Sequence, residues 1–415
     1  MLNLVYKSFP FGDSEIFAEY EIPYLNEIAG NQYRIFSLYN GKDDRSKRNV
    51  DILGQQYIVN PSKMDYVRGA FSLFCPSVIN ELSHMKNREC RDSLSKCLWR
   101  MLYYRAYGYA LRRITQGIGI NDNEVFVSYW LNECAYAAIM LKHSRNSIKV
   151  VSRAHGFDVF EERCYLPYRN ELLSNLDAVF PINRIEKKYL LERYNESISE
   201  DKIHVAHLGI NIPEQYSLND SRGDFTIVSC SSIIHLKRLD LLVEALAEIE
   251  EFHFKWIHIG GGLLQEEIIG HAEEVLCHDN QSFEFLGQVP LAKVHDLYRE
   301  YNASLFVNCS DTEGVPVSIM EAMSYGIPVV ARDVGGNSEI VDNSNGLLLR
   351  TNCSAHELAD AIRTIHSMGE EEYVGLRHGA RSKVVTEFNA DHQYRNFFEE
   401  VMEPLDQESL WRGSH

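Results

Sequence analysis

Two glutamates, Glu313 and Glu321, lie eight positions apart in the stretch DTEGVPVSIMEAMSYGIPVVARDVGGNSE. Glu313 comes just before an expected helix, where a carboxylate can simply offset the helix dipole. Glu321 lies inside that helix among apolar neighbours, so this simple role does not explain it. Gly314 lets a ligand approach the backbone closely, and the N–H groups of Val317 and Ser318 at the helix start favour an anion. Two carboxylates around an anion-binding helix start suit a ligand that carries both phosphates and hydroxyls, such as a nucleotide-sugar.

The elements that must position these glutamates are visible in the same stretch. Residues 303–308 (ASLFVN) form a short apolar run typical of a strand. A helix is expected over residues 317–325, with Pro316 suited to its first position and Gly326 placed to cap its end. Residues 329–331 start the next buried strand. This order predicts a βαβ unit of a parallel sheet, in which ligands bind at the carboxyl ends of the strands.

The rest of the chain continues the alternation of strands and helices. Further strands are expected at residues 2–6, 125–130, 149–154, 177–183, 202–211, 225–229, 256–262, 283–290 and 345–349. Helices are expected from near Glu15, after residue 132, and over residues 241–249, 291–298, 355–365 and 388–402. The polar residues 213–223 are expected to form a linker.

The stretch around the two glutamates resembles a known family signature. Glu313-x7-Glu321, followed by GIPVVARDVGGNSEIV, resembles the EX7E signature of the retaining glycosyltransferases of family 4, which have the GT-B fold. The likeness includes the GVP turn, the AM-x-x-G-x-PVVA run and the glycine pair before Glu339. It is strongest over residues 225–350 and absent over about 40–120. The resemblance implies two Rossmann-like α/β domains facing each other across a cleft, with a C-terminal helix that crosses back to the first domain.

The resemblance also implies a role for each matching residue. Glu321 would hydrogen-bond the ribose, and Glu313 would bind the donor sugar close to the reacting centre. Lys237, with Arg238 and the helix start, would stabilise the departing diphosphate. The other donor-binding positions that it implies are Gly12, Ser232, Gly261, Gln288, Val289, Gly314, Val315, Pro316 and Val317. No metal cofactor is expected, because protein cations and the helix start replace it, and front-face substitution is favoured.

The phosphate-binding loop departs from the family pattern in one respect. The family has an arginine five or six residues before the lysine, where this chain has Ser231 and Ser232. Either Arg238 substitutes for the missing cation, or serine hydroxyls and helix-end amides bind the diphosphate. Both readings stay open from the sequence alone.

The first half of the chain supplies further candidates at strand ends. Gly12 and Glu15 follow the strand at 2–6, where doubly wound folds bind phosphate or substrate, although an ordinary turn explains a glycine there equally well. The FPxGxxExF pattern resembles the first loop of bacterial family members. His155 follows the strand at 149–154, and its AHGxDvF pattern resembles a loop whose histidine contacts the transferred sugar. The expected catalytic residues are thus His155, Lys237 and Glu313, and the expected acceptor contacts are Glu15 and Asp158. A structural contact is the alternative for Asp158.

Residues 71–115 are predicted to be helical and are locally basic, with aromatic side chains interleaved. The basic residues are Lys86, Arg88, Arg91, Lys96, Arg100, Arg105, Arg112 and Arg113. A helical hairpin with packed aromatics and solvated arginines is favoured, since charged runs on helices usually face solvent. The alternative is that residues 84–113 form a membrane-facing patch.

The length, net charge and cysteine content of the chain exclude several classes of protein. The 415 residues favour two domains, and the net charge of −18 argues against nucleic acid as a partner. Nine scattered cysteines without a CxxC pair argue against a disulfide framework or a zinc site and favour a reducing compartment. The N-terminus lacks a signal-peptide pattern, and no run is apolar enough to cross a bilayer. The expected domains are an acceptor-binding domain at 1–211 and a nucleotide-sugar-binding domain at 224–387, joined by a linker at 212–223. A helix that returns to the first domain is expected at 388–411 and a tag remnant at 412–415.

The expected function is transfer of a sugar from a nucleotide-sugar to a glycan or lipid-linked acceptor in bacterial surface-polysaccharide biosynthesis. The expected location is the cytoplasm, with peripheral contact at the inner face of the plasma membrane. Two other classes stay open. One is a nucleotide-sugar-binding protein of GT-B fold without transfer; the other is a different GT-B chemistry, such as epimerisation or phosphorolysis.

Overall fold

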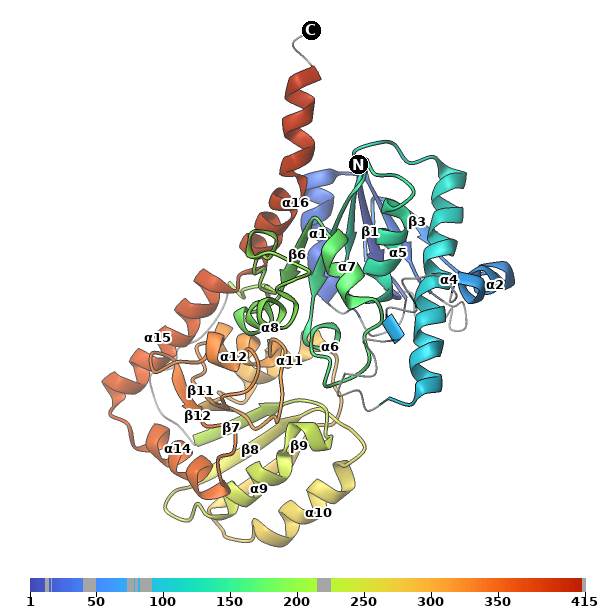
Figure 1. Ribbon diagram of the computed structural model, residues 1–415. Coiled ribbons are helices and arrows are strands. Elements are labelled where there is room, and N and C mark those ends of the chain that lie inside the picture. The colour runs from blue at the N-terminus through green and yellow to red at the C-terminus, as the bar shows by residue number, and fades with distance from the viewer. Residues whose placement is uncertain are drawn as a thin grey trace. The chain divides into compact units, whose positions relative to one another are not determined.

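The computed structural model describes residues 1–11, 15, 17–39, 50–72, 78, 81–82, 92–214 and 225–412, apart from the side chains at 291–292 and 403–412. The chain divides into two compact units. Unit 1 contains Met1–Gly209 and Ala390–His415, and unit 2 contains Ile210–Asn389 (Figure 1).

Unit 1 is built on a parallel sheet of six strands in the order β3-β2-β1-β4-β5-β6. Its strands are β1 (Leu2–Tyr6), β2 (Tyr33–Ser37), β3 (Gln55–Ile58), β4 (Val125–Ser128), β5 (Lys149–Ala154) and β6 (Ala178–Pro181). Strands β1, β2 and β4 are buried along their whole length, as expected where helices cover both faces of a parallel sheet. The strand order reverses between β1 and β4, and the loops after these strands flank that point.

Unit 2 repeats the architecture with the order β12-β11-β10-β7-β8-β9. Its strands are β7 (Phe225–Cys230), β8 (Phe254–Ile259), β9 (Gln281–Phe285), β10 (Leu305–Asn308), β11 (Val329–Arg332) and β12 (Gly346–Leu349). Counted along the chain within each unit, both sheets have the order 3-2-1-4-5-6 of doubly wound nucleotide-binding folds. The expected pair of Rossmann-like parallel-sheet domains is confirmed.

Helices alternate with the strands along the chain in both units (Figure 1). Those of unit 1 are α1 (Phe17–Ala29), α2 (Lys63–Ser72), α4 (Leu94–Ile118), α5 (Glu133–Lys142), α6 (Gly156–Val159), α7 (Arg169–Asn175), α8 (Arg184–Tyr194) and α16 (Ala390–Arg412). Those of unit 2 are α9 (Leu239–Ala247), α10 (Gln265–Val275), α11 (Leu291–Glu300), α12 (Val317–Ser324), α13 (Asn337–Ile340), α14 (Ala355–Ser367) and α15 (Glu370–Glu387). The C-terminal helix α16 returns to unit 1, where it packs against α1.

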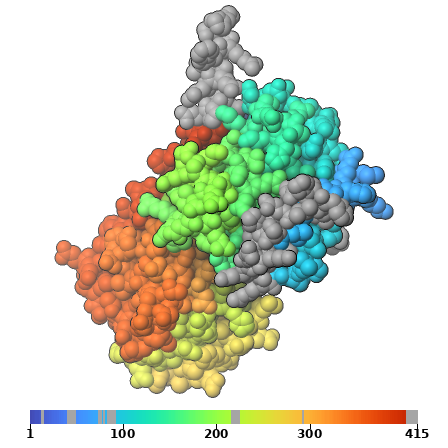
Figure 2. Space-filling view, viewed as in Figure 1, coloured from blue at the N-terminus to red at the C-terminus, as the bar shows by residue number. Residues whose placement is uncertain are grey.

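The prediction that residues 71–115 are helical holds for the other described residues of that segment but is wrong at Asp92 and Ser93. Helix α2 ends at Ser72 and α4 begins at Leu94, while Ser93 is extended. The Asp92 carboxylate explains the break, because it accepts hydrogen bonds from Lys96 Nζ at 2.5 Å and from the Tyr165 backbone N–H at 3.2 Å. Helix α4 lies at the surface of unit 1 in the cyan to teal region of Figure 2.

The predicted strand at 202–211 is also wrong. The N–H groups of His204 and Ala206 donate to carbonyls of β6, but only Ile203 forms a bridge with that strand. The segment therefore follows the sheet edge without becoming part of it and then leaves unit 1. Unit 2 begins at Ile210 and ends at Asn389, and of the expected linker only residues up to 214 lie within the described part of the chain.

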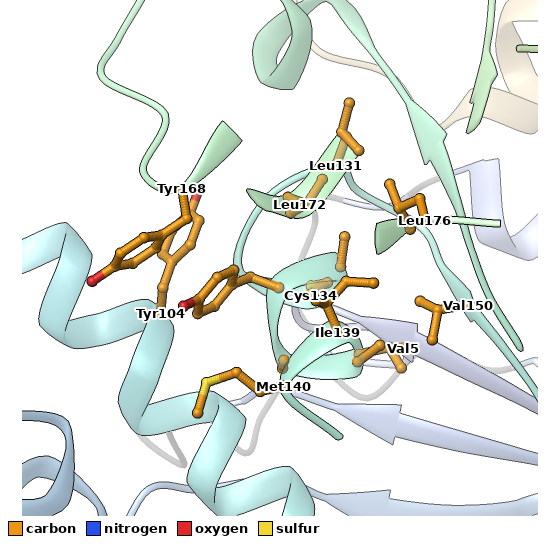
Figure 3. Packing of buried hydrophobic residues seen from close by; sticks show 14 of the residues in the cluster. Val5, Tyr104, Leu131, Cys134, Ile139, Met140, Val150, Tyr168, Leu172 and Leu176 are labelled. Atoms are coloured by element: carbon orange, nitrogen blue, oxygen red, sulfur yellow. The ribbon is translucent and has the colours of Figure 1, made fainter. Parts of the chain in front are cut away.

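Apolar side chains fill the space on both faces of each sheet. In unit 1, α5 is buried almost completely between the sheet and α4. Tyr104 of α4, Tyr136 of α5 and Tyr168 form an aromatic series across this layer, with ring centroids 5.9 and 4.5 Å apart (Figure 3). None of the helices in the described part of the chain is long and apolar enough to cross a membrane.

Candidate active site

Helix α12 and the loop before it hold both glutamates of the predicted βαβ unit. Strand β10 ends at Asn308, α12 begins at Val317 after Pro316, and β11 follows at Val329. The loop after β10 and the loop after β7 flank the point where the strand order of this sheet reverses. The predicted cap is present at Gly326, which has φ of +67° and donates its N–H to the Met323 carbonyl at 2.8 Å.

Glu313 is the centre of a polar cluster. Its Oε1 accepts hydrogen bonds from Lys237 Nζ at 2.6 Å, Ser310 Oγ at 2.5 Å and Asn308 Nδ2 at 3.2 Å. The two charged side chains are only 21% (Lys237) and 10% (Glu313) exposed, so water screens their attraction weakly. All three groups donate to Oε1, and these hydrogen bonds fix the orientation of the carboxylate. None of the three donates to Oε2.

Glu321 lies in the second turn of α12 in an apolar environment. Its side chain is 4% exposed, and burial raises its pKa from the ordinary value of 4.5 to about 7. Its Oε1 has no hydrogen-bond partner among the described residues, and His295 Nε2 of α11 lies 4.0 Å away. A buried carboxylate without a partner is costly unless a ligand supplies hydrogen bonds.

The predicted glycine pair supports the Glu313 loop. A Cβ at Gly335 would lie 1.9 Å from the Glu313 carbonyl oxygen, and one at Gly336 would lie 2.4 Å from the Gly314 carbonyl oxygen. The Gly336 N–H donates to that Gly314 oxygen at 2.9 Å. Gly335 also has φ of +52°, which favours glycine. Only glycines let the loop after β11 pack this closely against the loop that positions Glu313.

The loop after β7 carries the two predicted phosphate-binding cations. Lys237 ends a short 3₁₀ turn, and Arg238 adopts the left-handed conformation before α9. Arg238 forms ion pairs with Asp240 at 2.9 Å and with Asp311 at 3.5 Å. Ser232 is exposed on the same loop. The geometry thus brings Lys237 to Glu313 and ties Arg238 to neighbouring carboxylates.

The glycine loop after β8 packs on this same segment. A Cβ at Gly260 would lie 1.9 Å from the Ser231 carbonyl oxygen, and Gly261 accepts a hydrogen bond from the Ile233 N–H at 3.0 Å. Gly261 also lies beside the backbone nitrogen of Gln288, 3.5 Å from an ideal Cβ position. Gln288 is exposed and Val289 half-buried, just before α11. The predicted donor-binding segments of unit 2 are therefore neighbours in space.

In unit 1, His155 follows β5 and is almost fully buried between aromatic rings. Its ring centroid lies 4.9 Å from that of Tyr129 and 4.6 Å from that of Trp130. Neither ring nitrogen has a hydrogen-bond partner among the described residues. Burial, with a smaller contribution from Arg153, lowers the pKa of His155 to about 3, so the ring is neutral at physiological pH.

Glu15 and Asp158, the two predicted acceptor contacts, accept hydrogen bonds from the backbone of loops. Glu15 is buried, and its carboxylate accepts hydrogen bonds from the N–H groups of Lys7, Ser8 and Phe9 and from Trp130 Nε1. Asp158 accepts from the backbone N–H groups of His155 and Leu131, both at 2.6 Å. Burial raises the pKa of Asp158 to about 7. These carboxylates shape the loops at the strand ends, and Gly12 lies outside the described residues.

Several contacts of the site had no signal in the sequence. Asn308 and Ser310 contact Glu313, and His295 approaches Glu321, but each is an ordinary polar residue in its own segment.

The basic segment is only partly described, since Lys86, Arg88 and Arg91 lie outside the described residues. Three of its arginines have partners within unit 1, namely Arg100 with the Tyr165 carbonyl, Arg105 with the Tyr168 hydroxyl and Arg113 with Asp65. No cluster of metal-binding side chains occurs in the part of the chain that is described.

Known proteins share this sequence and architecture. Residues 214–382 match the family model for glycosyl transferases group 1. An uncharacterized glycosyltransferase of Methanocaldococcus jannaschii is 32% identical over 261 residues, which cover 60% of this chain and 68% of that protein. The chain belongs to the group 1 glycosyl transferases.

Other relatives include proteins of bacterial polysaccharide synthesis. The amylovoran biosynthesis glycosyltransferase AmsK of Erwinia amylovora is 27% identical over 62% of this chain and 64% of its own length, so the match leaves more than a third of AmsK uncovered. The putative colanic acid biosynthesis glycosyltransferase WcaL of Escherichia coli is 23% identical over 75% of this chain and 80% of its own length.

Solved structures match over almost the whole chain. Sucrose-phosphate synthase of Thermosynechococcus elongatus has a TM-score of 0.70 at 17% identity, covering 98% of this chain and all of the other. HepE of Anabaena in complex with UDP has a TM-score of 0.66 at 14% identity, covering 97% of this chain and 99% of the other. At these identities the likeness establishes the fold, which is that of the GT-B glycosyltransferases.

Proposed function

We propose that the protein is a retaining, metal-independent glycosyltransferase. It moves a sugar from a nucleoside diphosphate sugar to a glycan or lipid-linked acceptor in the assembly of a bacterial surface polysaccharide. The names of AmsK and WcaL support the polysaccharide, and the family supports sugar transfer. The complex of HepE with UDP makes uridine nucleotides the first donors to test.

One observation carries the proposal: Glu313, which is fixed by its ion pair with Lys237, and Glu321, whose buried Oε1 has no hydrogen-bond partner among the described residues, belong to the same loop and helix. Lys237 is held at 2.6 Å from Glu313 just before α12, and Glu321 follows within α12. The pair and the N–H groups of Val317 and Ser318 at the start of α12 suit a diphosphate and a sugar. The empty hydrogen-bonding capacity of Glu321 suits the hydroxyls of a ribose.

The chemistry follows from these positions. As the bond between the sugar C1 and the diphosphate oxygen breaks, negative charge grows on the leaving phosphate. Lys237 and the dipole of α12 stabilise that charge, which would otherwise need a cation from solution. Glu313 holds the donor sugar, and the acceptor oxygen attacks C1 from the face that the diphosphate leaves, passing its proton to the leaving phosphate. His155, neutral and set among aromatic rings, contacts the sugar through an uncharged nitrogen.

The acceptor places the enzyme at the inner face of the plasma membrane under this proposal, because lipid-linked glycans are held there. Residues 84–113 are the candidate contact. Their described arginines Arg100, Arg105 and Arg113 already have partners in unit 1, so the contact would be weak. Co-sedimentation with anionic vesicles at low salt measures it.

A second function is favoured by one observation, the state of Arg238. This cation, which could replace the missing family arginine, is held by Asp240 and Asp311. A protein that binds nucleotide-sugars without transferring the sugar would tolerate that loss. Glu313→Ala distinguishes the two functions, since it abolishes turnover only if turnover exists.

The decisive experiment supplies UDP-, GDP- and ADP-sugars and CMP-linked sugars with a panel of glycan acceptors in EDTA and measures nucleotide release. The anomeric configuration of the product is then assigned by NMR. We expect one donor to react in EDTA with retention. Reaction only after a divalent metal is added, or an inverted product, refutes the corresponding part of the proposal.

A further inference from the structure

Unit 1 contains a cavity of about 650 Å³ that none of the roles above explains. It is lined by residues that follow β1, β4 and β5 within a few positions, namely Lys7, Trp130, Asn132, Glu133, Phe157 and Asp158. The carboxyl ends of parallel strands are where α/β folds bind ligands. The first turns of α4 and residues 164–166 form its other side. Its size lies in the range of small-ligand pockets.

Aromatic side chains dominate the walls of this pocket. They are Trp99, Tyr103, Tyr104, Trp130, Phe157 and Tyr165. The flat faces of such side chains can pack against the C–H face of a ring in a bound ligand. Trp99 and Phe157 are 56% and 70% exposed, which is unusual for large apolar residues and indicates a surface that a ligand covers.

The walls are held in place by contacts behind them. Tyr104 is anchored in the aromatic series with Tyr136, and Trp99 stacks on Tyr66 of α2 with centroids 6.1 Å apart. Trp130 donates its Nε1–H to Glu15 at 2.8 Å. A pocket fixed in this way needs little ordering when a ligand binds, which favours affinity.

The charges at the pocket select against a strongly anionic ligand. Lys7 pairs with Glu133 at 3.3 Å, and Lys96 and Arg100 both pair with Asp92, at 2.5 and 3.1 Å. Lys96 and Arg100 share one acid, so two acids offset these three cations, and the single remaining positive charge is too little to balance a diphosphate. These ion pairs still offer donors and acceptors to hydroxyl groups, beside an aromatic wall.

Trp130 lies between the pocket and His155, the candidate catalytic residue of unit 1. The ring that forms part of the wall lies 4.6 Å from His155. An occupant packed on Trp130 is therefore one ring away from the histidine. Within unit 1, an occupant of the pocket therefore lies beside the residue that the proposed function assigns to contact with the transferred sugar.

We propose that this pocket binds a neutral sugar residue of the acceptor glycan, with its C–H face on the aromatic walls and its hydroxyls on the Lys7–Glu133 pair. The inference rests on the proposed function and names the part of the acceptor that unit 1 recognises. The lipid and diphosphate parts of a lipid-linked acceptor lie outside the pocket.

The test uses saturation-transfer NMR on the full chain with methyl glycosides of glucose, galactose, mannose and N-acetylglucosamine. Farnesyl diphosphate is the lipid probe. We expect at least one glycoside to bind through its ring C–H protons and to bind about tenfold more weakly to Trp99→Ala, the effect of losing one aromatic contact. Trp99→Phe should keep most of the affinity, and Phe71→Ala, which removes an aromatic of similar exposure outside the pocket, should change nothing.

Three results overturn the inference: no glycoside binds, the binding is the same in Trp99→Ala, or only farnesyl diphosphate binds and loses affinity in Trp99→Ala. Nucleotide binding is measured on the same samples by thermal shift. If nucleotides bind and glycosides do not, the pocket assignment fails while the proposed function stands. If no nucleotide binds to the wild-type protein, the proposed function itself fails.

Discussion

Replacing Glu321 with glutamine should stabilise the ligand-free protein at pH 8 and leave it nearly unchanged at pH 5. Glutamine keeps the shape of the side chain but never ionises. In the wild-type protein, burial raises the pKa of Glu321 above its ordinary value, so the folded state keeps a proton that the unfolded chain loses. The free energy of unfolding therefore falls as the pH rises from about 4.5 to 7, and the loss remains complete above that window.

The magnitude follows from the two pKa values. They are 4.5 and about 7, and each pKa unit corresponds to about 1.4 kcal/mol, which gives about 3 kcal/mol at high pH. At pH 5 the same linkage amounts to less than about 1 kcal/mol. For a domain of the size of unit 2, 3 kcal/mol corresponds to a rise in melting temperature of roughly 6–12 °C.

Scanning calorimetry of wild-type and Glu321→Gln proteins at pH 5 and pH 8, without nucleotide, measures this difference. Glu313→Gln is the matched control on the same helix unit, and it should not stabilise at either pH because it breaks the ion pair with Lys237. An equal change at both pH values for Glu321→Gln, or a loss of stability at pH 8, would refute the reasoning that burial penalises the ionised carboxylate.

Other predictions concern the remaining parts of the site. Lys237→Met should lower kcat on the order of 10²–10³-fold in the nucleotide-release assay, since it removes charge stabilisation of the leaving group; an unchanged kcat would remove Lys237 from the mechanism. Gly335→Ala should lower the melting temperature, because its Cβ would overlap the Glu313 carbonyl oxygen, whereas Gly270→Ala in α10 meets no atom within 4 Å and should be neutral or stabilising. His155→Phe should reduce turnover but keep stability, and the wild-type pH–rate profile should have no inflection between pH 5 and 8 from a histidine whose pKa is about 3; an inflection there that His155→Phe abolishes would contradict a neutral ring.

Local signals in the sequence were enough to predict the unit around Glu313. Proline before the helix and glycine after it act within a few residues, and the strands on either side are short apolar runs. Strand β3 carries no such signal, because its residues QQYI lie at the sheet edge and most of them are exposed. Helix α15 was missed for a similar reason: it contains two glycines and little apolar periodicity.

The other errors and gaps arise from contact between distant residues. The break before α4 depends on Asp92 meeting the Tyr165 backbone, 73 positions away. Asn308 and Ser310 acquire a role only when the loop places them on Glu313, and Lys237 reaches Glu313 from 76 positions away. The aromatic pocket is likewise assembled from segments that carry no shared motif.

The central claim is that unit 2 binds a nucleoside diphosphate sugar through Glu321, Glu313 and Lys237. The most direct measurement is the melting temperature of the protein with UDP, GDP, ADP, CMP and their sugars, beside the Glu321→Ala variant. A ligand that binds only the folded state raises the melting temperature, by the equivalent of about 2.7 kcal/mol at a hundred times its Kd. We expect one nucleotide series to raise it in the wild-type protein and to lose that effect in Glu321→Ala. No shift with any nucleotide, or the same shift in the variant, would contradict the claim.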